Sequence, residues 1–319
     1  MVEVLGVKHF VTGGAGFIGS HLTAWLLQNG RDVTVYDNLS MGRKAFIEHN
    51  LGNPRFCFVE GDLLNYKLLE EQMAGHDFVW HLGANGDIAK GVSNPDLDLN
   101  NGIIATQNVM KAMKANGIKR LVYTSSSTVY GDIKLYPTPE TAAPLFPESF
   151  YGASKLAGEA IISAWCHLFD MQAWVFRFGN VVGARMRRGV IHDFIAKLRK
   201  NPNELEILGD GMGHKNFFLV EDCIEGMLTA VNRADVQPCD VFNLGCESTT
   251  KISAIARIVA EEMGLKNVRF RTTGGKRGWP GDVPNVIYDV SKMKSLGWQA
   301  KHTSDEAVRI AARRLLGEE

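Results

Sequence analysis

A tyrosine and a lysine four residues apart, in Tyr151-Gly-Ala-Ser-Lys155, are the residues of this sequence best suited to acid–base chemistry. On a helix, this spacing places both side chains on one face. A phenol with an unperturbed pKa near about 10 is a poor base at neutral pH, but an adjacent ammonium group favours the phenolate. Such a phenol could remove the proton of a substrate hydroxyl. The competing interpretation is an ordinary amphipathic helix that contains Tyr and Lys at this spacing.

A run of hydroxyl side chains argues against the interpretation of this segment as an ordinary amphipathic helix. Thr124-Ser125-Ser126-Ser127-Thr128 precedes Val129-Tyr130-Gly131, and Ser126 lies 25 residues upstream of Tyr151. The run follows a predicted strand, so a hydroxyl at its end could hold the reacting oxygen against the phenol.

A second set of residues has the spacing of a dinucleotide site. Gly13, Gly16 and Gly19 form a GxxGxxG triad between a predicted strand and a predicted helix. Backbone amides at such a helix N-terminus can face a pyrophosphate, and the helix dipole favours its negative charge. Asp37 follows 18 residues after Gly19, where a carboxylate accepts hydrogen bonds from a ribose diol and repels a 2′-phosphate. The pattern predicts NAD rather than NADP, against the alternative of a structural glycine turn.

Asp62, in Gly61-Asp62-Leu63, follows the third predicted strand. Its carboxylate suits recognition of the adenine amino group, and a helix N-cap is the competing explanation.

The elements that must position these residues alternate between strands and helices in the N-terminal half. Nearly all-apolar strands separated by helices are typical of a parallel sheet covered on both faces, so we predict an α/β, Rossmann-type doubly wound sheet. We expect an NAD-binding domain over residues 1–178, with a returning segment near 216–246, and a smaller C-terminal α/β substrate lobe over 179–319. Strands are predicted at 9–12, 32–37, 56–60, 78–82 and 121–125, and helices at 20–29, 100–116, 189–200, 222–232, 253–263 and 304–316.

Composition excludes several classes of protein. The 319 residues carry 35 Lys+Arg and 35 Asp+Glu, so no basic surplus argues for a nucleic-acid polymer as partner. The five cysteines form no CxxC pair, which argues against a disulfide framework and a zinc ribbon, and we expect no metal. No apolar run is long enough for a membrane span, and no signal peptide is recognisable. We therefore expect a cytoplasmic protein.

The chain resembles the extended short-chain dehydrogenase/reductase family, specifically the NAD-dependent nucleotide-sugar epimerases and dehydratases, and is most similar to UDP-glucose 4-epimerase-like enzymes. The resemblance covers almost the whole chain and rests on seven motifs in family order. These are Gly13-Gly-Ala-Gly-Phe-Ile-Gly19, Tyr36-Asp-Asn-Leu-Ser40, Gly61-Asp-Leu63, His81-Leu-Gly-Ala84, Ser125-Ser-Ser-Thr-Val-Tyr-Gly131, Tyr151-Gly-Ala-Ser-Lys155 and Arg177-Phe-Gly-Asn-Val-Val-Gly183.

The resemblance implies roles for individual residues. Tyr151 would be the base, Lys155 would orient the nicotinamide ribose and lower the Tyr151 pKa, and Ser126 would assist, with Ser125 as the alternative. The positively charged nicotinamide ring would also favour the phenolate. The implied cofactor-binding residues, besides Tyr151 and Lys155, are Gly13, Gly16, Phe17, Ile18, Gly19, Asp37, Asn38, Leu39, Ser40, Gly42, Asp62, Leu63, Leu82, Gly83, Ala84, Thr124 and Phe178.

Family members oxidise a hexose carbon, usually C4, and differ in the fate of the resulting ketone. Dehydratases carry an acidic pair after the serine or threonine, where this chain has Ser127 and Thr128. Decarboxylases usually carry Glu at the position of Thr128. The absence of both features favours 4-epimerisation of a UDP-glucose/UDP-galactose type substrate. An epimerase or decarboxylase of nucleotide-linked uronic acids and an NAD(P)H-dependent nucleotide-sugar reductase are the alternatives.

Substrate recognition is expected in the C-terminal lobe. In the family, the positions of Ser126, Asn180, Val190, Lys215, Arg277 and Asp282 contact the substrate. Lys215 replaces a more usual Arg, two extra residues separate Arg277 from Asp282, and Gly102 stands where many relatives carry Asn. Asn100 or Asn101 could substitute for that Asn or simply cap a helix. Val286 stands where epimerases restricted to unmodified hexoses carry Tyr, which predicts tolerance of N-acetylated sugars.

Three arginines after the Asn180 motif, Arg185, Arg187 and Arg188, are interpreted as solvated or phosphate-facing charges. If they bound a carboxylate instead, the substrate would be a uronic acid.

Relatives commonly dimerise through a four-helix bundle, so we expect a homodimer. The segments 100–116 and 151–169 would form the bundle, with Ile161, Ile162 and Trp165 at the seam. The alternative is that these three side chains belong to an ordinary core.

Overall fold

A computed structural model describes residues 7–317, and the chain divides into two compact units. The first unit comprises Met1–Val129, Ser149–Arg177 and Met227–Phe242, and the second comprises Tyr130–Glu148, Phe178–Gly226 and Asn243–Glu319. Residues 130–148, predicted from the sequence to belong to the cofactor domain, group here with the second unit. No helix within residues 7–317 has both the length and the apolar character needed to span a membrane.

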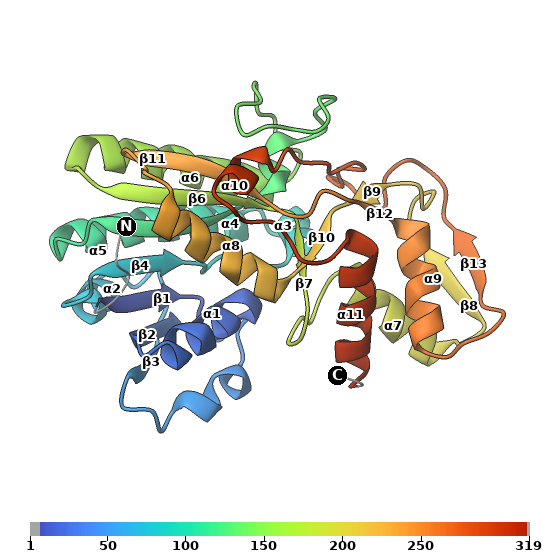
Figure 1. Cartoon of the computed structure of the whole chain (residues 1–319), viewed down its shortest axis with the longest axis horizontal. Helices are drawn as coiled ribbons and strands as arrows, with labels where there is room; N and C mark the ends of the chain where they lie inside the picture. The colour runs from blue at the N-terminus through green and yellow to red at the C-terminus, as the bar shows by residue number, and fades with distance from the viewer. Residues whose placement is uncertain (1–6, 318–319) are drawn as a thin grey trace. The chain divides into compact units, whose positions relative to one another are not determined.

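The first unit is built on a seven-stranded sheet with the strand order β3-β2-β1-β4-β5-β6-β11 (Figure 1). The strands are added toward one edge of the sheet from β1 to β3 and toward the other edge from β4 onward. This strand order is that of the Rossmann fold, so the predicted doubly wound architecture is confirmed. The pairs β1–β2, β2–β3, β1–β4 and β4–β5 are parallel. The strands are β1 (Lys8–Thr12), β2 (Asp32–Asp37), β3 (Phe56–Glu60), β4 (Phe78–His81), β5 (Arg120–Ser126), β6 (Gln172–Phe178) and β11 (Cys239–Leu244).

Helices cover both faces of this sheet (Figure 1). On one face, α5 (Ala105–Ala115) packs between α2 (Tyr66–Met73) and α6 (Phe150–Phe169). Alternate strand residues such as Phe10, Val79 and Leu121 meet these helices in one buried apolar cluster. The other face carries α1 (Phe17–Gln28) and the second half of α8 (Val220–Arg233). The short helices α3 (Ile88–Ser93) and α4 (Asp96–Asp98) and the 3-10 helices η1 (Lys44–Phe46), η2 (Glu48–Asn50) and η4 (Ser127–Tyr130) lie in connections.

The predicted helix over 100–116 is in fact two different segments. A π-helical segment, η3 (Leu99–Ile104), precedes α5, and single π-helical turns are frequent at functional sites. The first helix also begins earlier than predicted, at Phe17, because Gly16 serves as its N-cap residue. The other predicted elements agree with the structure to within two residues at each end.

The second unit contains short two-stranded sheets and the helices predicted for the C-terminal half. Its strands are β7 (Asn180–Val182), β8 (Glu204–Ile207), β9 (His214–Lys215), β10 (Phe217–Leu219), β12 (Thr250–Lys251) and β13 (Arg269–Thr272), and its helices are α7 (Val190–Lys200), the first half of α8, α9 (Ile252–Glu262), α10 (Ser291–Ser295) and α11 (Ser304–Leu316). The glycine- and proline-rich segment 273–284 contains no helix or strand.

Candidate active site

A crevice for a dinucleotide is expected where the strand order of an open α/β sheet reverses, at the carboxyl ends of the strands. Here that point lies between β1 and β4, whose last residues Thr12 and His81 are partners in the parallel register. Gly13 and Gly83 follow these strands and are packed backbone to backbone, since a Cβ on Gly13 would lie 2.7 Å from the Gly83 nitrogen. Gly13 has φ +69°, which a glycine adopts without strain.

The glycine loop fits a pyrophosphate. A Cβ on Gly19 would lie 2.2 Å from the Gly13 carbonyl oxygen, so the turn can close only on glycine at this position. Helix α1 starts immediately after Gly16 with no side-chain cap and no acidic residue in its first turn. The free amides of that turn, together with the helix dipole, are suited to a diphosphate, and Phe17 and Ile18 belong to the same turn.

Asp37 lies at the end of β2, where its carboxylate accepts hydrogen bonds from the amides of Ala15 (3.0 Å) and Leu39 (2.8 Å). Burial raises the pKa of Asp37, and these two amide hydrogen bonds act in the opposite direction. Gly42 is packed against the same carboxylate, because a Cβ there would lie 2.9 Å from both oxygens. Each oxygen retains a lone pair, so the residues present fit the ribose diol of NAD.

Asp62 is held beside the same loop but does not cap a helix. Its carboxylate accepts from the Asn38 side chain (2.8 Å) and from the Leu64 amide (2.8 Å), whereas Asn65 is the N-cap residue of α2. The N-cap alternative for Asp62 is therefore wrong. Asn38 in turn accepts hydrogen bonds from Ser40.

Tyr151 and Lys155 lie one turn apart in α6, and the structure brings both to the end of β5. Ser126 lies beside the Tyr151 phenol, whose pKa it lowers, and its hydroxyl oxygen accepts from the Thr128 amide at 3.2 Å and the Thr128 hydroxyl at 3.0 Å. The Lys155 ammonium donates to the carbonyl oxygen of Thr124 at 2.6 Å, and its nitrogen lies 5.8 Å from the centre of the Tyr151 ring. Ser126, and not Ser125, is thus the hydroxyl that meets the phenol.

Ser125 has a different task. Its hydroxyl donates to the Glu159 carboxylate at 2.5 Å, and Arg177 donates to both oxygens of that carboxylate, at 3.0 and 2.7 Å. All three residues are buried. This ion pair fastens α6, one turn beyond Lys155, to β5 and β6.

The electrostatics of the pair depart from the sequence-based expectation. Burial and, to a smaller extent, the Asp98 carboxylate raise the pKa of Tyr151 to about 12, against the lowering effect of Ser126. Burial lowers the pKa of Lys155 to about 8, against the raising effect of Asp98 and Glu159. The expected lowering of the Tyr151 pKa is therefore not found in the chain by itself, because desolvation of the phenolate dominates.

Asp98 is a buried carboxylate that sequence reasoning missed. One oxygen accepts from the Asn85 side chain at 2.9 Å, and the other has no hydrogen-bond partner within residues 7–317. Burial raises the pKa of Asp98. Asp98 is the last residue of α4, directly before η3, and no motif surrounds it, so only the folded chain reveals that its charge acts on Tyr151 and Lys155.

Gly102 in η3 is explained by its packing. A Cβ at this position would lie 2.5 Å from the Ser154 hydroxyl oxygen, so η3 rests directly on α6 between Tyr151 and Lys155. The Asn101 side chain donates to the carbonyl of Leu97, and Asn100 is exposed. Neither asparagine caps a helix.

The residues expected to bind substrate in the second unit are already engaged with carboxylates or carbonyls. Lys215 donates to Asp282 at 2.6 Å, Arg277 pairs with Glu148 and with Asp132, and Asn180 donates to the carbonyl of Asn216 at 3.0 Å. All of these partners belong to the second unit. Phe178 and the partly buried Val190 and Val286 belong to the same unit.

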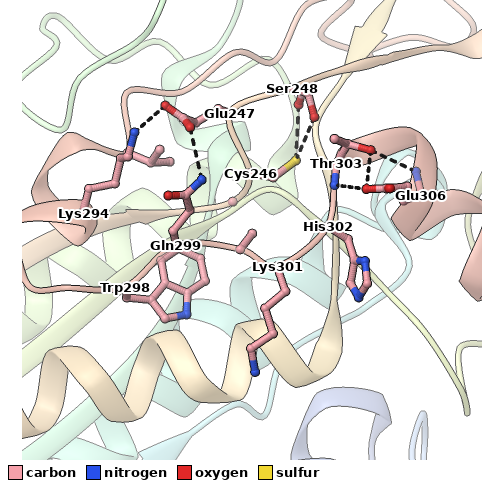
Figure 2. Close-up of a pocket in the computed structure, with 13 residues that line it drawn as sticks. Cys246, Glu247, Ser248, Lys294, Trp298, Gln299, Lys301, His302, Thr303 and Glu306 are labelled. Carbon is pink, nitrogen blue, oxygen red and sulfur yellow. Dashed lines mark hydrogen bonds and ion pairs between the residues drawn. The ribbon is translucent and has the colours of Figure 1, made fainter.

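The second unit also contains a cavity of about 210 Å³ between the segment after β11 and the start of α11 (Figure 2). Glu247 contacts Lys294 and Gln299, and Thr303 and Glu306 form a capping box. Lys301 pairs with Glu225, which lies outside the lining. The cavity includes none of the predicted site residues. No group of three or more potential metal ligands occurs in the part of the chain that the structure describes.

Comparisons with known proteins agree with this geometry. Residues 9–245 match the model of the NAD dependent epimerase/dehydratase family. A putative UDP-glucose 4-epimerase of Methanocaldococcus jannaschii is 32% identical over 94% of this chain and 95% of its own length. A crystal structure of a UDP-galactose 4-epimerase is 38% identical, covers 98% of this chain and 99% of the other, and superposes with a TM-score of 0.87. UDP-glucuronic acid decarboxylase 2 of Arabidopsis thaliana is 31% identical over 93% of this chain, which spans only 65% of that longer protein.

Proposed function

Because the chain belongs to the NAD-dependent epimerase/dehydratase family, whose cofactor is NAD, we propose that it inverts C4 of a nucleotide-diphosphate sugar of the UDP-glucose/UDP-galactose type. The observation that carries the proposal is that Tyr151 and Lys155 share one helix face beside Ser126, next to positions 127 and 128, which carry only hydroxyl side chains. A 4-keto sugar formed there meets no carboxylate at those two positions to take a second proton, so elimination is disfavoured.

We propose for the side chains the roles that the family resemblance implies, and their contacts are compatible with these roles. Ser126 holds the C4 hydroxyl against the phenol, and the ionised Tyr151 removes its proton and later returns one to the 4-keto oxygen. Lys155, tied to the Thr124 carbonyl, supplies positive charge beside the phenol and orients the nicotinamide ribose. When bound, NAD supplies reversible hydride transfer at C4, and its positively charged nicotinamide ring favours the phenolate form of Tyr151.

We assign substrate recognition to the second unit. Lys215 and Arg277 are two cations that we assign to a diphosphate, and two or three such donors suffice for it. Both are ion-paired with carboxylates, so substrate binding exchanges these internal partners for phosphate oxygens. Valine at position 286 leaves room for an N-acetyl group, which supports acceptance of N-acetylhexosamines.

One coupled assay tests the reaction. The purified protein is offered UDP-glucose, UDP-galactose, their N-acetylated counterparts, UDP-glucuronic acid, and GDP- and CDP-linked sugars. The proposal predicts interconversion of a C4 pair without net consumption of NADH. Release of carbon dioxide from the uronic acid would identify a decarboxylase instead, and stoichiometric consumption of NADH would identify a reductase.

The Tyr151→Phe variant is the matched control for the chemistry. Phenylalanine keeps the ring and removes only the hydroxyl, so turnover should disappear while the protein still carries NAD through gel filtration. Retained turnover would overturn the assignment of Tyr151.

We also propose a cytoplasmic homodimer. The five cysteines are all free thiols, which supports a reducing compartment. Apolar side chains remain exposed beside α5 and on α6, with Ile104 42% and Leu168 73% exposed. Ile162 is fully buried in the core of the first unit and is excluded from a seam, whereas Ile161 and Trp165 are only partly buried. Light scattering after size-exclusion chromatography tests the dimer.

A further inference from the structure

A chain of hydrogen bonds runs across the ends of β1 and β4, where the sheet order reverses. The Gly83 amide donates to the Thr12 hydroxyl oxygen at 3.1 Å. That oxygen lies 2.8 Å from Nδ1 of His81, and Nε2 of His81 lies 3.1 Å from the Thr106 hydroxyl oxygen. The Thr106 hydroxyl donates to the carbonyl of Gly102 at 2.5 Å. Five residues are thereby linked through one imidazole.

The partners fix the direction of every bond in this chain. Thr106 uses its single proton on the Gly102 carbonyl, so it must accept from Nε2–H of His81. Nδ1 then carries no proton and accepts from the Thr12 hydroxyl, whose oxygen accepts from the Gly83 amide. Only the Nε2–H tautomer of His81 gives every donor an acceptor.

Burial keeps the chain in this state. His81, Thr12 and Thr106 are at most 1% exposed. Burial, together with the charge of Lys155, lowers the pKa of His81 to about 3, so the ring stays neutral at physiological pH. A broken link would leave a buried polar group without a partner, which is costly in a protein interior.

The two ends of the chain reach the two halves of the candidate site. At one end, the backbone of Gly83 packs against the backbone of Gly13 in the glycine loop. At the other end, Gly102 rests on Ser154, between Tyr151 and Lys155 on α6. The hydrogen bonds therefore span from the cofactor cradle to the catalytic helix.

We propose that His81 is a positioning residue that, through Thr12 and Thr106, fixes the cofactor loop at Gly83 relative to the π-helical segment on which α6 rests. The proposal rests on the NAD site assigned above and not on which sugar is epimerised. The alternative is a core histidine whose contacts stabilise the fold without setting the geometry of the cofactor site.

Threonine-to-valine variants test the link because valine is nearly isosteric and removes only the hydroxyl. Thr106→Val changes the end of the chain remote from the glycine loop, and Thr12→Val changes the near end. Thr23→Val is the matched control, since Thr23 is a buried threonine in α1 whose hydroxyl has no partner within the described residues. The dissociation constant for NAD is measured by calorimetry on the full chain for all three variants and for the Thr12→Val/Thr106→Val double variant.

We expect Thr106→Val to weaken NAD binding about fivefold or more, the size of one lost buried hydrogen bond. The double variant should bind NAD about as weakly as the weaker-binding single variant, because either change interrupts the same chain of hydrogen bonds. Thr23→Val should bind as the parent protein does. Parent-like binding by Thr106→Val, or additive losses in the double variant, would overturn the proposal.

Nitrogen-15 NMR of histidine-labelled parent protein provides a readout that needs no variant to retain NAD. The signals of His81, identified by their loss in His81→Gln, should show a protonated Nε2 and a bare Nδ1 that do not titrate near neutral pH. An Nδ1–H tautomer or a titrating ring would contradict the hydrogen-bond direction. Neither measurement uses turnover, so failure of the epimerase proposal would leave this result standing, and the reverse also holds.

Discussion

The buried ion pair between Glu159 and Arg177 predicts a large and specific loss of stability in Arg177→Met. The Glu159 carboxylate accepts three hydrogen bonds, two from Arg177 and one from Ser125, and both charged side chains are less than a tenth exposed. Methionine removes two of the three and leaves a buried carboxylate without its counter-charge. Breaking one side of a buried pair costs about 3–5 kcal/mol, so we expect the free energy of unfolding to fall by about that amount.

The Glu159→Met/Arg177→Met double variant separates burial of a lone charge from loss of packing. With both charges removed, the main remaining cost is the Ser125 hydroxyl without its acceptor, about 1–3 kcal/mol. The double variant should therefore be about 2 kcal/mol more stable than Arg177→Met alone. Equilibrium urea unfolding followed by circular dichroism measures both values.

Arg271→Met is the control for this experiment. Arg271 also pairs with glutamates, Glu204 and Glu206, but its side chain is 47% exposed, so its loss should change stability by less than about 1 kcal/mol. An Arg177→Met variant that loses no more stability than Arg271→Met, or a double variant less stable than the single variant, would refute this account of the pair.

Three further predictions concern the candidate site. Gly19→Ala should abolish NAD retention after gel filtration, because its Cβ would lie 2.2 Å from a carbonyl oxygen, whereas Gly52→Ala, with no atom within 4 Å of the added Cβ, should retain NAD. Asp98→Asn removes a charge that raises the pKa of Lys155, so the pKa of Lys155 should fall below about 8. The alkaline limb of the pH–rate profile should then move about one pH unit lower. An unchanged alkaline limb would contradict this role of Asp98. Lys215→Met should raise KM for the nucleotide sugar about tenfold and change kcat by less than a factor of about two, as expected for a residue that contacts only the diphosphate.

The fold and the cofactor loop could be predicted from the sequence because their determinants are local. Strand β2 (Asp32–Asp37) and strand β3 (Phe56–Glu60) were predicted with their observed bounds from apolar runs and flanking turn residues. The glycine spacing before α1 likewise needs only the strand–turn–helix context. Such signals are complete within about ten residues of chain.

The polar surroundings of the catalytic pair could not be predicted in the same way. Asp98 acts on Lys155 from a distant part of the sequence, and its sequence neighbours give no sign of it. Glu159 lies one turn beyond Lys155 on α6, but its burial and its pairing with Arg177 become visible only in the fold. The expected lowering of the Tyr151 pKa is not found in the chain by itself, because the sequence shows the nearby lysine but not the depth of burial, which raises this pKa. Desolvation is a property of the packed structure, so spacing alone cannot supply it.

The charge balance around Tyr151 explains why a buried phenol can still be a useful base. Lys155 and Arg177 are two buried basic side chains, and Asp98 and Glu159 are two buried carboxyl groups, so their formal charges balance while the phenol is protonated. Ionisation of Tyr151 adds an uncompensated negative charge at a desolvated position, and its raised pKa expresses that penalty. The chain by itself therefore keeps the proposed base protonated until positive charge is added beside it. In an enzyme whose cofactor alternates between a positively charged and a neutral ring, this arrangement links proton removal to the oxidised state of the cofactor.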